Sequence, residues 1–221
     1  MDRAPWVIGL VFGLSLSVVI VLLGPLLLFN PLFTSALQVR HGVAAELDAP
    51  QAEVERVTGS YLADIYLDGD FDASLAGDGP LLDESERSHM TDVSRLVRLL
   101  AGILVLALVL AGVTAAWLRH EPRRQGRIML TASGAIGAVA VVLAIVFAVA
   151  FEPAFLAFHE LFFPPGTYLF APGSELIVLF PEPFWFDAAL LAGAAIVLGA
   201  VVASLIGLWR WRSGRATIAP A

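Results

Sequence analysis

The amino-acid sequence predicts an all-α, polytopic membrane protein with four transmembrane helices and two extracytoplasmic loops that contain short interfacial helices. Three observations support this prediction. Hydrophobic residues make up 58% of the 221 residues, charged residues make up only 15%, and the mean hydropathy is +0.83. Four long runs carry no charged residue, and polar or proline-rich stretches separate them. We therefore expect residues 1–221 to form a single integral membrane domain.

The four uncharged runs are long enough to cross a bilayer. At about 1.5 Å of rise per residue, roughly 20 residues cross a hydrocarbon core of about 30 Å. The runs cover residues 6–29, 99–118, 128–151 and 188–209, which leaves outer loops at about 30–95 and 152–187. The first run is far longer than the apolar core of a secretion signal, so we expect it to remain as the first span. Asn30-Pro31 should end that span.

The distribution of arginine predicts the orientation of the spans. All thirteen basic residues are arginine, because the sequence contains no lysine. Arg3, the arginines of residues 119–127 and those of residues 210–215 lie on one side of the membrane if there are four spans. The positive-inside rule makes that side cytoplasmic. We therefore expect a plasma-membrane protein with both termini in the cytoplasm and a site at the outer leaflet.

The first outer loop contains an amphipathic helix. Asp48 is its predicted N-cap, with Pro50 in its first turn and Gln51 at the capping-box position. Apolar residues then follow at helical spacing, at Val54, Val57, Tyr61 and Ile65. We expect this face to pack on the membrane surface or on the spans.

A second helix start lies just before the second span. Asp83 and Glu86 have the spacing of a capping box, and the helix that they begin should run unbroken into the span. His89 and Asp92, three residues apart, then lie on the same face of this helix.

The second outer loop is apolar, aromatic and interrupted by prolines. A short helix is expected over residues 154–163, ended by Pro164-Pro165, and its length indicates an interfacial or re-entrant segment. Ser174 is the expected cap of another short helix over residues 175–180. Trp185 lies at the start of the last span, where an aromatic belt is expected.

Two of the four histidines are candidate catalytic residues. His89 and His159 should both lie at the outer interface among apolar neighbours, each beside a carboxylate, whereas His41 and His120 fall in polar segments and should be solvated. Because imidazole titrates near neutral pH, two interfacial histidines suit general acid–base catalysis. The alternative is that each one merely forms a hydrogen bond within a loop.

Other chemistry is excluded or only weakly indicated. The absence of cysteine excludes disulfides, thiolate metal sites and a cysteine nucleophile, and the absence of lysine excludes a Schiff base. Asp92 or Glu160 could join the histidines around a metal, but no HxxxH or HExxH spacing supports one. No serine lies in a GxSxG motif and no glycine-rich nucleotide motif is present. We expect no metal, no cofactor and no nucleic-acid partner.

Three short motifs resemble those of one bacterial family. They are HMTDV at residues 89–93, FHELFF at residues 158–163 and LIVLFPEPFW at residues 176–185. In these motifs the sequence resembles the lipoprotein intramolecular transacylases, which are four-span integral membrane proteins. The resemblance implies an acyltransferase that moves the sn-2 acyl chain of a lipoprotein's diacylglyceryl group onto the amine of its N-terminal cysteine, giving a lyso-form lipoprotein. Its expected partners are this lipoprotein substrate and membrane lipids.

By the same resemblance, His89 and His159 would be the catalytic residues. We expect four further residues to support them, namely Asp92, Glu160, Tyr168 and Trp185. The sequence departs from the family pattern at Tyr168, where a tryptophan is expected, and at Ser174-Glu175, where an aspartate is usual. The alternative function is that of a non-catalytic accessory protein that binds lipid or lipoprotein in the same groove. Ion transport is disfavoured because the four spans contain no ionisable residue.

Overall fold

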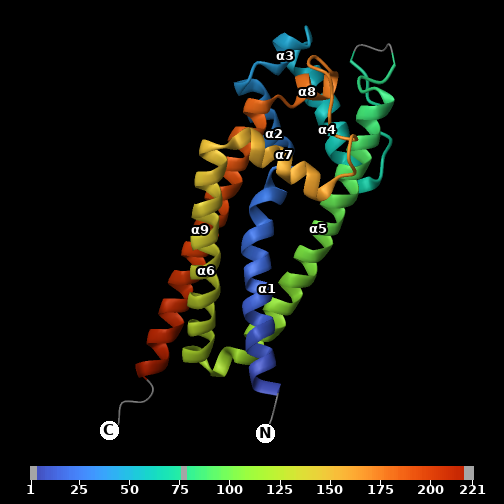
Figure 1. Ribbon diagram of the computed structural model, residues 1–221. Helices are drawn as coiled ribbons and strands as arrows, with labels where there is room; N and C mark the ends of the chain where they lie inside the picture. The colour runs from blue at the N-terminus through green and yellow to red at the C-terminus, as the bar shows by residue number, and fades with distance from the viewer. Residues whose placement is uncertain (1–3, 76–78, 217–221) are drawn as a thin grey trace. The chain divides into compact units, whose positions relative to one another are not determined.

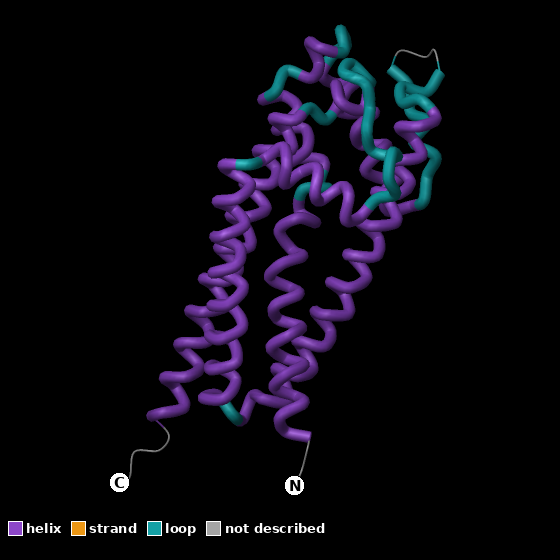
Figure 2. Tube along the Cα trace, in the orientation of Figure 1, coloured by secondary structure: helices purple, strands orange, loops and turns teal. Residues whose placement is uncertain are grey.

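The computed structural model describes residues 4–75 and 79–216, and every regular element within them is a helix (Figures 1 and 2). Arg3, which contributed to the predicted orientation, lies outside the described residues. The long helices are α1 (Ala4–Leu27), α5 (Glu84–Trp117), α6 (Pro122–Val149) and α9 (Glu182–Ala216). The shorter ones are α2 (Pro31–Arg40), α3 (Val43–Glu46), α4 (Gln51–Leu67), η1 (Leu118–His120), α7 (Phe151–Phe162) and α8 (Glu175–Leu179).

The four long helices are the candidate membrane spans. Among the described residues, α1, α5, α6 and α9 are the helices that are long and apolar enough to cross a bilayer. Each overlaps one of the four uncharged runs, so the prediction of an all-α protein with four spans is confirmed. Large apolar side chains stay exposed along them, for example at Leu106, Val142 and Leu205, as lipid-facing positions require.

The capping box before the second span forms as predicted. The Asp83 carboxylate accepts the N–H of Glu86, and the Glu86 carboxylate accepts the N–H of Asp83, each at 2.8 Å. These two bonds satisfy donors that the first turn of a helix leaves unpaired. From this start α5 runs without a break past His89 and into its apolar part.

The predicted N-cap at Asp48 is wrong. The helix α4 begins at Gln51 after Pro50, and no side chain caps it. Proline suits this boundary because its ring fixes φ near the helical value and it has no N–H to satisfy. Asp48 instead has a φ of 47° in the turn that follows α3, a short helix that the sequence analysis did not predict.

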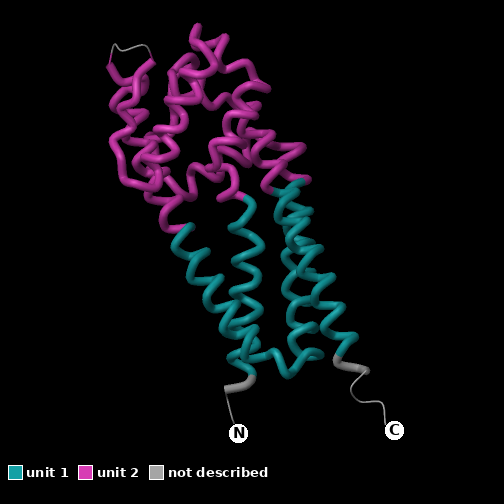
Figure 3. The backbone as a smooth tube through the Cα atoms, turned by 180° about the vertical axis from the view of Figure 1, so that it is seen from behind, with its two compact units in different colours: residues 1–24, 101–144, 193–221 teal, residues 25–100, 145–192 magenta. Residues whose placement is uncertain are grey.

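The chain forms two compact units, coloured separately in Figure 3. Unit 1 comprises residues 1–24, 101–144 and 193–221, and unit 2 comprises residues 25–100 and 145–192. The second unit therefore contains both predicted outer loops.

Small residues let the helices of unit 1 approach closely. A Cβ placed on Gly126 of α6 would lie 2.5 Å from the carbonyl oxygen of Gly207 on α9. The hydroxyls of Ser133 and Ser204 meet at 2.7 Å between the same two helices. Without a hydrophobic driving force between helices in lipid, such close backbone packing and interhelical hydrogen bonds favour association.

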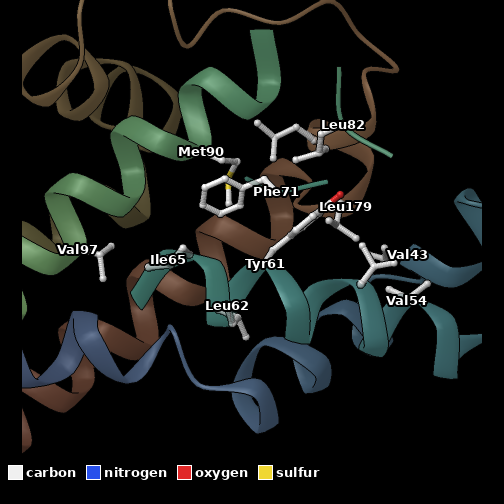
Figure 4. Packing of buried hydrophobic residues seen from close by; sticks show 12 residues of the cluster. Val43, Val54, Tyr61, Leu62, Ile65, Phe71, Leu82, Met90, Val97 and Leu179 are labelled. Carbon is white, nitrogen blue, oxygen red and sulfur yellow. The ribbon is translucent and has the colours of Figure 1, made fainter. Parts of the chain in front are cut away.

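Unit 2 has its own hydrophobic core, shown in Figure 4. The predicted apolar face of α4 lies in it, since Val54, Val57, Tyr61 and Ile65 are all buried. Met90 and Val97 of α5 and Leu179 of α8 pack into the same cluster. The outer segments therefore bury their apolar residues against one another, which holds α5 and α8 around a common site.

Candidate active site

A cavity of about 300 Å³ lies within unit 2. Its lining residues come from the turn between α1 and α2, from α2, α4, α5, α7 and α8, from the loop between α7 and α8, from the turn between α8 and α9, and from the start of α9. Most of them are apolar or aromatic. The ionisable side chains in the lining are Tyr61, His89, Glu152, His159, Tyr168 and Glu182. An apolar cavity with a few convergent polar groups is typical of a small-molecule or lipid site.

His89 is a buried member of the lining, with only 6% of its surface exposed. Its ring packs edge-on against Phe163 and Phe170, with centroids at 4.9 and 5.6 Å. Its Nδ1 atom is buried and has no hydrogen-bond partner within the described part of the chain. A buried polar atom without a partner is costly, and such an atom at a cavity is a candidate to bind a ligand.

His159 lies on α7 and has a defined orientation. Its Nδ1 atom lies 2.8 Å from the carbonyl oxygen of Phe155, to which it donates, so Nε2 is left free to accept a proton. The rings of Phe155 and Tyr168 flank the imidazole, with centroids at 4.3 and 5.4 Å. Burial lowers the pKa of His159 from its ordinary value, and the bond to Phe155 opposes this shift. The neutral imidazole is therefore favoured.

The structure brings the two histidines together from α5 and α7. Their ring centroids are 6.0 Å apart and their planes meet at 27°. Both line the same cavity, so a group bound there can contact both rings. Two imidazoles at this spacing can divide proton transfer and charge stabilisation between them.

Of the four residues expected to support the histidines, two line the cavity. Tyr168 and Trp185 do so, whereas Asp92 and Glu160 are not among the lining residues. The Asp92 carboxylate instead accepts a bond of 2.8 Å from Arg95 on the same helix. Glu160 is exposed.

Two other carboxylates, those of Glu152 and Glu182, line the cavity and were missed in the sequence. Glu152, Phe155 and His159 share one face of α7 by their spacing. This helix was expected to begin at residue 154, but it begins at Phe151 and so includes Glu152. Glu182 lies in the first turn of α9, one turn before Trp185. Among the described residues, no group of three or more His, Cys, Asp or Glu side chains comes together as a metal site.

The remaining two histidines lie away from this cavity. His41 is not solvated as predicted, because its Nε2 atom lies 2.9 Å from Asp187 and its side chain is only 17% exposed. Arg40 bonds the same carboxylate oxygen at 3.0 Å. His120 is exposed, as predicted, and accepts a hydrogen bond from Arg119.

Comparisons with known proteins agree with the fold and the resemblance. A family model described as lipoprotein intramolecular transacylase Lit matches residues 6–185. The solved structure of the membrane integral Lit from Bacillus cereus is similar, at 19% identity and a TM-score of 0.84, over 95% of this chain and 97% of that chain. Two structures of the same protein, each with a histidine substituted, give TM-scores of 0.77 at 18% identity. They cover 96% and 95% of this chain, and 93% and 94% of theirs.

No curated protein matches the chain in sequence. The structural likeness, at this identity, establishes the fold. The family model establishes the family, because its match covers most of the chain, including both histidine motifs. The chain belongs to the lipoprotein intramolecular transacylase family.

Proposed function

We propose that this chain is a membrane transacylase that moves the sn-2 acyl chain of a lipoprotein's diacylglyceryl group onto the α-amino group of its N-terminal cysteine. The product is a lyso-form lipoprotein. Family membership supports the reaction and the lipoprotein substrate. The observation that carries the assignment to this site is the pair of imidazoles 6.0 Å apart in an apolar cavity.

His159 serves as the general base in this proposal. Its Nε2 atom is free because Nδ1 is bonded to Phe155, and its lowered pKa keeps the ring neutral. As the amine nitrogen attacks the ester carbonyl carbon, a C–N bond forms and Nε2 takes a proton from the nitrogen. When the intermediate collapses, the bond from the carbonyl carbon to the sn-2 oxygen breaks and the same proton passes to that oxygen.

His89 stabilises the oxyanion of the tetrahedral intermediate. Its buried Nδ1 has no partner in the described residues, so an N–H there is free to donate to a charge that develops in the cavity. The amine and the ester belong to one substrate molecule, so proximity is supplied largely by the substrate itself. No covalent enzyme intermediate is needed.

The other members of the site bind and orient the substrate. Tyr168, Trp185 and the phenylalanines of the lining offer an apolar surface to the acyl chain. Glu152 and Glu182 line the cavity and can attract the substrate's α-ammonium group, which releases one proton to solvent before the neutral amine attacks. Asp92 and Glu160 lie outside the lining, and Asp92, one turn beyond His89, is bonded to Arg95. The site faces the outer leaflet of the plasma membrane, with both termini cytoplasmic, as the arginine distribution supports.

The test is conversion of a diacylglyceryl lipopeptide to its N-acyl lyso form by purified protein in lipid, followed by mass spectrometry. General acid–base catalysis contributes about 10²–10⁴-fold, so His89→Asn and His159→Asn should each nearly abolish turnover. His120→Asn is the matched control, because His120 is exposed and is not among the residues that line the cavity. It should keep wild-type turnover.

Near-normal turnover by either variant at the site would contradict the role given to that histidine. An inactive wild-type protein would overturn the proposed reaction itself and favour an accessory protein that binds lipid or lipoprotein.

A further inference from the structure

The short helix α8 is a wall shared by two cavities of unit 2. Leu176 and Ile177 line the cavity that holds the histidines, and Ile177 also lines a second cavity of about 290 Å³. Leu176 and Leu179 are also buried in the hydrophobic core of unit 2. The position of α8 therefore sets part of the shape of the cavity that holds the histidines.

This helix is too short to be stable by itself. It has five residues, and isolated helices of that length do not form in water because nucleation is unfavourable. Ser174 occupies its N-cap position, but the hydroxyl makes no capping bond and has no partner among the described residues. The support of α8 must come from other helices.

Two fully buried polar side chains supply that support. Glu86 of α5, 2% exposed, accepts the N–H of Leu176 through Oε1 at 2.9 Å. Gln38 of α2, 0% exposed, donates through Nε2 to the carbonyl oxygen of Leu179 at 3.1 Å. The first bond pairs a donor at the start of α8 and the second pairs an acceptor at its end.

Glu86 supports α8 from α5, the helix that also carries His89. It lies one turn before His89, and its second oxygen, Oε2, accepts the N–H of Asp83 in the capping box of α5. One carboxylate thus caps both α5, which carries His89, and α8, which lines the same cavity. Within the described residues, no arginine or histidine forms an ion pair with it. A buried carboxylate without a counter-ion depends on such hydrogen bonds.

We infer that Glu86 is a positioning residue for transacylation, which fixes the wall formed by α8 at a set distance from the imidazole of His89. The inference rests on the proposed function. Its physical basis is that acyl transfer requires the reacting atoms to be held close and aligned, and a displacement of about 1 Å can cost about 10²-fold in rate. Glu86 touches neither histidine in this role; it acts through the backbone of α8.

The diagnostic variant is Glu86→Gln. An amide has one acceptor oxygen and an NH₂ group, so it can accept only one of the two backbone N–H groups and presents donors to the other. Either α5 or α8 then loses its cap. We expect kcat for the diacylglyceryl lipopeptide to fall by about 10- to 100-fold, because the reacting atoms are no longer held in line. KM should change by less than about threefold, because most of the apolar surface that binds the acyl chain is unchanged.

Two further variants separate the positioning of α8 from the overall stability of the fold. Asp83→Ala removes the other half of the capping box on α5 and leaves the bond from Glu86 to Leu176 in place. Gln38→Leu removes the tether at the far end of α8 without touching α5. Both should lower the melting temperature. Asp83→Ala should keep kcat within about threefold of wild type, since it leaves α8 bonded at both ends, whereas Gln38→Leu frees the far end of α8 and should lower kcat as well.

Hydrogen exchange of the segment 174–180 provides a readout that does not depend on activity. Glu86→Gln should speed exchange there, and Asp83→Ala should not. If kcat falls equally in Glu86→Gln and Asp83→Ala at an equal loss of melting temperature, Glu86 acts through stability alone and the inference is overturned. It is also overturned if Glu86→Gln exchanges and turns over like wild type. An inactive wild-type protein would instead show that the proposed function has failed.

Discussion

Burial of His159 links the chemistry of the site to the stability of the fold. The burial lowers the pKa of this side chain below its ordinary value of 6.5, so the folded protein binds this proton less readily than the unfolded chain does. Stability then rises with pH wherever the unfolded chain carries more protons. The contribution of His159 is complete above about pH 6.5 and is lost as the pH falls through the lower pKa of the folded state.

A comparison of the wild type with His159→Asn tests this linkage. Asparagine does not titrate, so the melting temperature of the wild type should fall further than that of the variant when the pH is lowered from 8 to 5. Measuring the difference between the two proteins cancels the titration of groups that do not interact with His159. A difference that stays constant across this range, or that grows in the opposite direction, would show that His159 has no lowered pKa.

Single residues also show where reading the sequence succeeds and where it stops. His89 and His159 could be selected because each lies in an apolar motif at the expected interface. The carboxylates that were expected to support them, Asp92 and Glu160, do not line the cavity. The bond between His41 and Asp187 joins residues 146 positions apart, and no local pattern indicates such a pair. Partners of this kind depend on tertiary packing.

At the scale of helices, the contact between α6 and α9 depends on glycine. A Cβ at Gly126 would lie 2.5 Å from the carbonyl oxygen of Gly207 and 2.6 Å from the backbone nitrogen of Trp211, and neither backbone atom can rotate away. Gly126→Ala should therefore destabilise the protein by about 1–3 kcal/mol, as overpacking commonly does. Thermal unfolding in detergent or lipid measures the effect.

The same helix supplies the control. Gly134 of α6 is exposed, and a Cβ there would meet nothing within 4 Å. Gly134→Ala should be neutral or stabilise by up to about 1 kcal/mol, because alanine favours the helical conformation. Equal effects of the two substitutions would mean that α6 and α9 do not approach closely at Gly126.

Helix starts were predictable where side chains cap them and obscure where they do not. Asp83 and Glu86 form the capping box that their spacing indicates. By contrast, α4 begins after Pro50 without any side-chain cap, so Asp48 did not indicate the start of this helix. The start of α8 is capped by Glu86, 90 residues earlier in the chain, and Ser174 at the N-cap position contributes no bond.

At the scale of the whole molecule, the bilayer makes the spans easy to predict. Every backbone polar group must be paired inside lipid, so long uncharged runs have to be helices, and all four runs are. The cavity could not be predicted in the same way. Its lining joins the turn after α1 to the start of α9 through segments far apart in the sequence, and apolar periodicity does not say which apolar faces meet.

The orientation of the chain in the membrane is the last prediction, and it can be tested without removing any native residue that reacts with thiol reagents. The sequence has no cysteine, so a single introduced one is the sole labelling site. Ala45 and His120 are both exposed, the first in α3 and the second in η1, between α5 and α6. Arginine is retained on the cytoplasmic side, so the turn that holds Arg119, Arg123, Arg124 and Arg127 should face inward.

In intact cells a membrane-impermeant maleimide should therefore label Ala45→Cys at once and His120→Cys only after the membrane is opened. Labelling of His120→Cys from outside would reverse the orientation and place the histidine cavity on the cytoplasmic side. That result would conflict with a lipoprotein substrate at the outer leaflet, even if the fold and the two histidines were placed correctly.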